Sequence, residues 1–354
     1  MTKDTTSSPR PVSIAIAGLG NWGRNHVRTF GQMPDAHLAA LADQSEKVLA
    51  KYKNQYPHTR LVTDIRDVLG DPSIEGVVVA TPATAHAAVA LAALDAGKHV
   101  FVEKPMALEV SDAEAMVAKA RAKKRILMVG HLLIYHPAVA TVKALIDSGE
   151  IGEVYYLYSQ RVNLGVIRKD ENALWSFAPH DIAVICHLLG EVPDRVTAQG
   201  ESYLQKGIED VVFLQLHFPD RRMASIQLSW LDPHKLRKLT IVGSKKMVVF
   251  DDQEASEKVK VYDKGVAQTG EVSYGEILSL RFGDILIPKI DAREPLVAEC
   301  RHFLDCIREG KESLTPGESG AEVVRILEKA GESLRKGGVP VSLKDIAKKR
   351  KHAE

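Results

Sequence analysis

A glycine pattern near the start of the chain, Gly18-Leu19-Gly20-Asn21-Trp22-Gly23, constrains the fold more than any other feature. It directly follows the apolar segment 13–17 and precedes a segment with helical periodicity. Its glycines permit a tight turn, close approach of the backbone to a pyrophosphate and close helix packing, while the helix N-terminus supplies amide donors. Asp43 ends the next predicted strand, where a carboxylate can accept the adenosine ribose hydroxyls. The pattern predicts a Rossmann unit whose cofactor contacts are Gly18, Gly20, Asn21, Trp22, Gly23 and Asp43.

The residues beside Asp43 indicate which dinucleotide is preferred. Gln44 and Ser45 follow it, and no arginine stands next to it. A carboxylate without a neighbouring guanidinium repels the 2′-phosphate of NADP. We therefore predict NAD as the cofactor, with NADP less favoured.

The hydrophobic period predicts an α/β protein in which alternating strands and helices give way to successive strands part-way along the chain. Short apolar runs alternate with helical patterns at first, which is typical of βαβ units and a doubly wound parallel sheet. A capping box of Ser111 and Glu114 predicts the start of one helix, which runs to Lys124. After about Gly152 strands follow one another, which predicts a second, mostly antiparallel open sheet, and two helical patterns come late in the chain. Strands are expected at 13–17, 37–42, 76–80, 99–102 and 126–129, then at 154–159, 195–198, 211–218, 223–230, 239–242, 247–250 and 259–262.

These patterns predict two domains with short tails. The predicted parts are a flexible tail over 1–11, an NAD-binding Rossmann domain over 12–130, a substrate-binding and oligomerisation domain over 131–340, and a basic tail over 341–354.

Composition narrows the kind of partner. Lys and Arg total 47 against 46 Asp and Glu, so the net charge of +1 provides no field that would attract nucleic acid or an anionic membrane. Residues 1–11 have no apolar signal core, and the uncharged stretch 77–94 is expected to be a buried strand followed by a helix. The three cysteines, Cys186, Cys300 and Cys306, are too few for a disulfide framework or a cysteine zinc site. We expect a cytoplasmic protein with a small-molecule substrate.

Two further predicted strands end in Thr81-Pro82 and in Glu103-Lys104-Pro105. In a doubly wound sheet the carboxyl ends of the strands form the binding crevice, so both motifs are expected along the cofactor. An ammonium beside the nicotinamide can donate hydrogen bonds to a substrate hydroxyl oxygen and stabilise alkoxide character as a hydride leaves. Lys104 is therefore predicted to be catalytic, the alternative being a surface turn.

These motifs resemble those of the glucose-fructose oxidoreductase, inositol dehydrogenase and rhizopine-catabolism (Gfo/Idh/MocA) family of NAD(P)-dependent sugar dehydrogenases. The matching residues are the glycine pattern, Thr81-Pro82 with His86, and Glu103-Lys104-Pro105. The resemblance implies a Rossmann domain, a C-terminal α/β domain whose open sheet often mediates oligomerisation, and a Lys-Pro peptide that is commonly cis. It further implies cofactor contacts from Thr81, Pro82, His86 and Glu103. Because an exposed sheet face on the second domain would need covering, we expect a homodimer or homotetramer.

The resemblance also implies a catalytic histidine on a helix of the second domain, in an Asp-x-x-x-His pattern. His180 takes the histidine position, but Ser176 stands where the aspartate is expected. Asp181 does not replace it, because adjacent helix positions do not share a face. A histidine can still take a hydroxyl proton near neutral pH without an acidic partner. Lys104 and His180 are the predicted catalytic pair.

The stretch 163–190 resembles the branch of the family that acts on UDP-N-acetylhexosamines. The resemblance implies oxidation of the C3 hydroxyl of UDP-N-acetylglucosamine to the 3-keto sugar nucleotide, as in lipid A amino-sugar synthesis. Guanidinium groups suit a diphosphate, and the predicted substrate residues are Arg161, Asn163, Arg168 and Trp175. No metal site is predicted, since His131 and His136 lack further ligands at a supporting spacing.

Two alternatives to this reaction remain at this stage. One is a dehydrogenase of a UDP-hexuronate, a free sugar or an inositol. The other is an NAD(P)-binding sensor or repressor of the same fold without chemistry, against which the presence of both Lys104 and His180 argues.

Overall fold

The computed structural model describes residues 10–268 and 278–344. The chain divides into two compact units. Unit 1 comprises Met1–Leu132 and Glu294–Val324, and unit 2 comprises Leu133–Arg293 and Arg325–Glu354. Most of the predicted tails, residues 1–9 and 345–354, lie outside the described residues.

Unit 1 contains a six-stranded parallel sheet in the order β3-β2-β1-β4-β5-β6. The strands are β1 (Val12–Ala17), β2 (Ala36–Ala42), β3 (Arg60–Val62), β4 (Gly76–Val79), β5 (His99–Glu103) and β6 (Leu127–Gly130). This order, which reverses between β1 and β4, is that of a dinucleotide-binding doubly wound sheet and confirms the predicted class. Only β3 was not predicted, because three partly exposed residues show no hydrophobic period.

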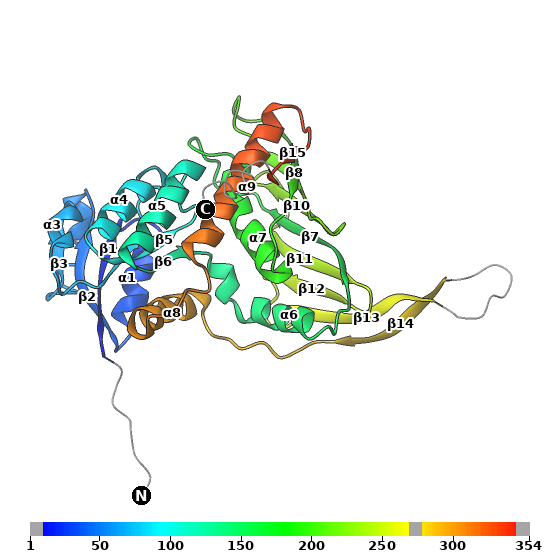
Figure 1. The fold of residues 1–354 in the computed structure, drawn as a ribbon, viewed down its shortest axis with the longest axis horizontal. Helices are drawn as coiled ribbons and strands as arrows, with labels where there is room; N and C mark the ends of the chain where they lie inside the picture. Colours follow the sequence, from blue (N-terminus) through cyan, green and yellow to red (C-terminus); the bar gives the residue numbers. More distant parts are fainter. Residues whose placement is uncertain (1–9, 269–277, 345–354) are drawn as a thin grey trace, which may run out of the picture. The chain divides into compact units, whose positions relative to one another are not determined.

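Helices cover both faces of this sheet. They are α1 (Gly23–Gly31), α2 (Glu46–Leu49), α3 (Arg66–Leu69), α4 (Ala83–Asp95), α5 (Val110–Lys123) and α8 (Pro295–Glu309). The pair α4 and α5 lies on one face, and the pair α1 and α8 lies on the other (Figure 1). The uncharged stretch 77–94 forms β4 and most of α4, as expected, and no described helix is long and apolar enough to cross a membrane.

The predicted N-cap residue of α5, Ser111, is wrong. The helix begins at Val110 with Glu109 as the N-cap residue, and no side chain caps it. Ser111 is therefore already inside the first turn, where its hydroxyl donates to the Glu109 carboxylate at 3.4 Å. The S-x-x-E pattern matched the sequence but not the position at which the backbone turns helical.

The prediction of one continuous second domain over 131–340 is also corrected. Helix α8 belongs to unit 1, where it contacts α1 and β1. Its amphipathic pattern buries Phe303 edge-to-face against Phe101 of β5, with ring centroids 5.6 Å apart. Arg301 and Arg308 form ion pairs with buried Asp35. The apolar period predicted the helix but not which of the two sheets it would cover.

Unit 2 contains a nine-stranded sheet in the order β14-β13-β12-β11-β7-β10-β9-β8-β15. The strands are β7 (Val154–Val162), β8 (Arg195–Glu201), β9 (Val211–His217), β10 (Met223–Ser229), β11 (Leu236–Gly243), β12 (Met247–Asp251), β13 (Val259–Gln268), β14 (Leu278–Leu286) and β15 (Val341–Ser342). Among these neighbours only β7 and β10 are parallel, which confirms a mostly antiparallel sheet. The predicted tail over 341–354 is corrected at its start, because Val341 and Ser342 pair with β8.

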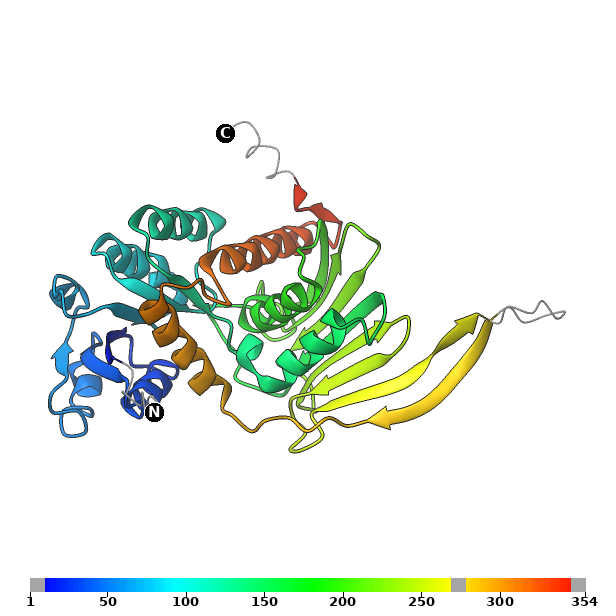
Figure 2. The ribbon, with the colours of Figure 1, turned by 60° about the horizontal axis from the view of Figure 1, so that its bottom comes forward.

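One face of this sheet is covered by helices α6 (Pro137–Asp147) and α7 (Ala173–Leu189), as Figure 2 shows. A 3₁₀ turn, η1 (Leu132–Tyr135), precedes α6, and α9 (Gly317–Arg335) begins in unit 1 and ends in unit 2. Successive side chains of a strand point to opposite faces of the sheet. In β10, Ala224, Ile226 and Leu228 are fully buried on one face, whereas Met223, the first residue of the strand, is 45% exposed.

Candidate active site

The glycine pattern forms the turn between β1 and α1, and each glycine has a distinct steric reason. Gly18 has a φ of +87°, and a Cβ there would lie 2.6 Å from the Ala80 carbonyl oxygen. A Cβ on Gly23 would lie 1.8 Å from the Gly18 carbonyl oxygen, so helix and turn are in close contact. A Cβ on Gly20 would meet nothing within 4 Å. Its open side leaves the backbone accessible to a pyrophosphate at the start of α1, so the turn fits a dinucleotide.

Asp43 lies at the carboxyl end of β2, beside this turn. Its Oδ2 accepts the Leu19 backbone N–H at 2.9 Å, and its Oδ1 accepts the Ser45 N–H at 2.9 Å. A carboxylate has about four acceptor positions, so two donors leave capacity for ribose hydroxyls. The half-buried carboxylate is thus held in place by the same turn whose cofactor it is predicted to contact.

His86 joins the turns that follow β4 and β5. It is 2% exposed, and its ring nitrogens lie 2.8 Å from the carbonyl oxygens of Pro105 and Thr81. Burial lowers the pKa of His86 below its ordinary value. The His86 ring engages the backbone on both sides and positions Thr81 and the Lys104–Pro105 peptide, which is cis, and its contact with the cofactor stays a prediction.

Glu103 is likewise turned into the protein. It is 7% exposed, its Oε1 lies 2.7 Å from His26 Nε2, and its Oε2 accepts the Lys104 backbone N–H at 3.3 Å. Burial alone would raise the pKa of Glu103, but the His26 hydrogen bond and the nearby positive charges lower it. This carboxylate holds the backbone of Lys104 in place, and the predicted contact of Glu103 with the cofactor stays a prediction.

Lys104 is half-buried at the end of β5, in line with the strand ends that carry the glycine turn and Asp43. Its charge also acts on His131, the residue that follows β6. Burial lowers the pKa of His131 to about 4, and the charge of Lys104 contributes to the same shift. Neither ring nitrogen of His131 has a hydrogen-bond partner among the described residues. Unit 1 thus brings the cofactor motifs, Lys104 and a neutral buried histidine to one edge of the sheet.

Unit 2 carries the second predicted catalytic residue on α7. The Asn172 side chain caps this helix by accepting the Trp175 N–H at 3.1 Å, and Gly190, with a φ of +66°, ends it. His180 is half-buried on the helix, and Ser176 is buried one turn earlier. Trp175 is half-buried in the first turn.

The structure redirects two of the predicted substrate residues. Arg161 is 6% exposed, and its Nε donates to Asp181 at 2.5 Å, so its guanidinium is engaged within the protein rather than left for a diphosphate. Arg168 is half-exposed and forms an ion pair with Glu171 at 2.9 Å. Asn163 is half-buried just after β7, where its backbone N–H donates to the Ser229 carbonyl at 3.0 Å.

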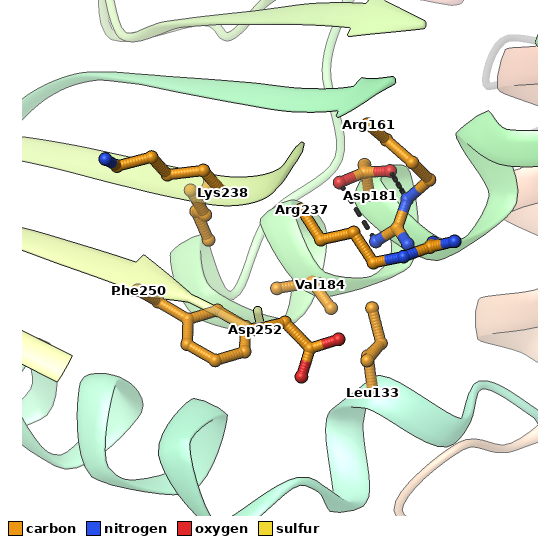
Figure 3. A pocket seen from close by; sticks show the side chains of 9 residues that line it. Leu133, Arg161, Asp181, Val184, Arg237, Lys238, Phe250 and Asp252 are labelled. Carbon is orange, nitrogen blue, oxygen red and sulfur yellow. Dashed lines mark hydrogen bonds and ion pairs between the residues drawn. The ribbon is translucent and has the colours of Figure 1, made fainter. Parts of the chain in front are cut away.

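A pocket lies between the sheet of unit 2 and its helices (Figure 3). It has a volume of about 330 Å³ that includes space open to solvent. Its lining consists of Leu133, Arg161, Asp181, Val184, Arg237, Lys238, Leu239, Phe250 and Asp252. The sequence analysis did not select Arg237 or Asp252, because no local motif surrounds them and only the register of β11 and β12 brings them to this site.

Comparison with known proteins identifies the family. Residues 12–131 match the family described as "Oxidoreductase family, NAD-binding Rossmann fold", and residues 139–249 match the GFO/IDH/MocA C-terminal domain. A solved structure assigned as an oxidoreductase from Magnetospirillum magnetotacticum MS-1 is 31% identical, with a TM-score of 0.77, covering 90% of this chain and 99% of that one. The chain belongs to the Gfo/Idh/MocA family.

Two further proteins match this chain at lower sequence identity. The scyllo-inositol 2-dehydrogenase (NAD(+)) of Bacillus subtilis is 25% identical over 94% of this chain and 96% of its own. The UDP-N-acetylglucosamine 3-dehydrogenase of Acidithiobacillus ferrooxidans is 20% identical, with a TM-score of 0.80, covering 92% of this chain and 99% of that one, a likeness of fold. Unit 1 is an NAD-binding Rossmann unit, and the protein is an NAD-dependent oxidoreductase of this family.

Proposed function

We propose that the protein is a sugar or polyol dehydrogenase in which unit 1 holds NAD and unit 2 holds the substrate. The observation that carries this proposal is the position of Lys104, half-buried at the end of β5 on the sheet edge that also carries the open glycine turn and Asp43. One relative acts on a polyol, as its name, scyllo-inositol 2-dehydrogenase, states. A lysine kept at such an edge by a buried histidine and a buried carboxylate is suited to chemistry rather than to a surface turn.

Each residue has a specific task in this proposal. The N-terminus of α1 and the turn 18–23 bind the pyrophosphate, and Asp43 binds the adenosine ribose. NAD, when bound, supplies the hydride acceptor. Lys104 donates a hydrogen bond to the substrate hydroxyl that is oxidised, and His180 accepts its proton as the carbonyl forms. Ser176, which replaces the family's expected aspartate, leaves His180 to act without an acidic partner from that position.

For the substrate itself we propose a UDP-N-acetylhexosamine, with oxidation of the C3 hydroxyl of UDP-N-acetylglucosamine to the 3-keto sugar nucleotide. The support is the resemblance of the segment 163–190 and the overall fold shared with a UDP-N-acetylglucosamine 3-dehydrogenase. A UDP-hexuronate, a free sugar and an inositol are the competing substrates.

The test is to incubate the purified protein with NAD⁺ and each sugar, and to follow NADH by its absorbance with a trap for the keto product present. NADH formation that requires UDP-N-acetylglucosamine is the expected result, and NMR of the product then identifies the oxidised carbon. NADH formed only from another sugar would refute the proposed substrate while keeping the reaction. Binding of NAD without reduction by any sugar or polyol would favour a sensor.

We also propose that unit 2 mediates a homodimer or homotetramer through the sheet face opposite α6 and α7. Large side chains lie exposed there: Tyr156 (44%), Tyr158 (40%), Phe213 (49%) and Met223 (45%). Register places Tyr156 beside Met223, and the rings of Tyr156 and Tyr158 stack at 6.5 Å. An apolar face of this kind is stabilised by a self-complementary partner. Light scattering should give a dimer or tetramer, and a monomer at micromolar concentration would contradict the proposal.

A further inference from the structure

Two arginines face each other across the centre of the sheet in unit 2. Arg161 of β7 and Arg237 of β11 are register partners in an antiparallel pair, so their side chains lie on the same face. That face is the one toward α7, since Asp181 of α7 binds Arg161. In Figure 3 the Arg237 side chain extends toward the Arg161 guanidinium. Like charges placed directly opposite on a sheet are destabilising unless anions compensate both.

Only one of the two charges is compensated from within the protein. Asp181 accepts hydrogen bonds from Arg161 and from the Ser159 hydroxyl, so each of its two carboxylate oxygens already has a donor. The Arg237 guanidinium has no hydrogen bond or ion pair with any side chain in the described part of the chain, although the residue is half-buried. Burial lowers the pKa of Arg237 below its ordinary value, and the charge of Arg161 adds to this.

The other charged groups around the pocket do not supply the missing anion. Asp252 faces Arg237 but lies 3.7 Å from both Lys258 and His136. Lys238 also lines the pocket, and its ammonium forms an ion pair with Asp251 at 3.8 Å. In and beside the pocket, the three positive charges of Arg161, Arg237 and Lys258 exceed the two negative charges of Asp181 and Asp252 by one. The remaining wall is apolar and includes Leu133, Val184, Leu239 and Phe250. An apolar wall with one convergent cation is typical of a ligand site.

We propose that Arg237 binds an acidic group of the substrate, a carboxylate or a phosphate, in this pocket. A planar guanidinium can hold either group through two parallel hydrogen bonds. The pocket is connected to the proposed chemistry by α7, because Val184 on its wall lies one turn after His180 and on the same helix face. The inference rests on the proposed function for the sugar part of the ligand and adds which residue recognises the acidic group of the substrate, namely Arg237 rather than Arg161.

The test measures binding separately from turnover. The NADH-bound protein is titrated calorimetrically with UDP-N-acetylglucosamine, N-acetylglucosamine 1-phosphate, glucuronate and neutral N-acetylglucosamine. Wild-type protein is compared with Arg237→Gln, with Arg237→Lys, and with Arg195→Gln as a matched control, since Arg195 is an exposed arginine at the start of β8 outside the pocket. Thermal unfolding establishes that each variant is folded.

We expect at least one acidic ligand to bind Arg237→Gln about 10- to 100-fold more weakly than wild type, the usual cost of a lost hydrogen bond to a charged group. The lysine variant should recover part of the affinity, Arg195→Gln should bind as wild type, and neutral N-acetylglucosamine should not distinguish the proteins. Whether the phosphates or glucuronate respond identifies the acidic group. Equal binding of every acidic ligand to wild type and Arg237→Gln would overturn the proposal.

The two proposals fail in different ways. Arg237-dependent binding without NADH formation from any ligand would refute the dehydrogenase reaction and retain the anion site. NADH formation from a neutral sugar with the same kinetics in wild type and Arg237→Gln would retain the reaction and refute the anion site.

Discussion

The nucleotide end of unit 1 and the pocket of unit 2 are built in opposite ways. At the nucleotide end, the groups that would touch NAD are backbone amides and one carboxylate, held by contacts among neighbouring turns such as Asp43 to Leu19 and His86 to Pro105. In the pocket, the polar groups are long side chains from separate strands, and Arg161 meets Arg237 only through strand register.

The difference shows which kind of site can keep an uncompensated charge. In unit 1 each buried ionisable side chain beside Lys104 either has a partner, as Glu103 has His26, or is neutral, as His131 is. Among the described residues of unit 2, Arg161 has a buried ion-pair partner and Arg237 has none. A site that binds its ligand through backbone amides needs no unpaired charge, whereas a side-chain site must leave one donor group open for the ligand.

The largest effect is expected on catalysis, where each unit contributes one residue. Lys104→Ala and His180→Ala should each lower turnover about 10²- to 10⁴-fold, because each removes a group that is proposed to act on the reacting hydroxyl. Lys51→Ala and His234→Ala, both at exposed positions, are the matched controls. NAD binding, measured by fluorescence titration, should be retained in the His180 variant. Wild-type turnover in either active-site variant would remove that residue from the mechanism.

The two facing arginines should differ sharply in stability. Arg161→Gln leaves the buried Asp181 carboxylate without its cation, which should lower the free energy of unfolding by about 3–5 kcal/mol. Arg237→Gln relieves a like-charge contact and should change it by less than about 1 kcal/mol. Urea denaturation of the two variants provides the comparison. Similar losses in both would mean that Arg237 is also paired within the protein.

The buried histidines of unit 1 should make stability depend on pH. The pKa of His131 is about 4 in the folded protein and about 6.5 when unfolded, so between these values the unfolded state binds more protons. Stability is therefore full above pH 6.5 and falls as the pH drops toward 4, by about 3 kcal/mol for this residue.

Unfolding free energies of wild type and His131→Gln, measured from pH 7 to pH 4.5, test this expectation. The variant should show a shallower decline, because one proton-binding group of the unfolded state is gone. His234→Gln, at an exposed position of unit 2, serves as the control and should keep the wild-type slope. An unchanged slope in His131→Gln would contradict the assignment.

The smallest effect is expected on cofactor choice. Asp43→Asn keeps one oxygen, which can accept from either the Leu19 or the Ser45 amide, and removes the negative charge that repels a 2′-phosphate. We expect the preference for NAD over NADP to fall about tenfold, the equivalent of about 1.4 kcal/mol. Dissociation constants for both cofactors check this, and an unchanged ratio would show that another residue selects the cofactor.

Sequence reasoning succeeded where a single segment contains the whole signal. The glycine turn and the strands before it and before Asp43 were predicted correctly because adjacent residues determine them, whereas the roles of Asp43 and Lys104 stay predictions from their motifs. The capping box at Ser111 shows the limit of this approach, since the observed N-cap residue is Glu109, two residues earlier, and the pattern makes no cap there. His86 and Glu103 were identified as part of the motifs, but their contacts with Pro105 and His26 depend on residues 19 and 77 positions away.

The amino-acid sequence by itself determined the doubly wound sheet, the second sheet and the nucleotide turn, because hydrophobic period and glycine sterics act over a few residues. Tertiary structure alone decided that α8 packs in unit 1 and that Arg161 forms an ion pair with Asp181. It also decided that Arg237 lines an open pocket. The physical reason is that a charge is compensated by what lies within a few ångströms in space. For these arginines that distance is set by the pairing of β7 with β11, two strands separated by more than seventy residues along the chain.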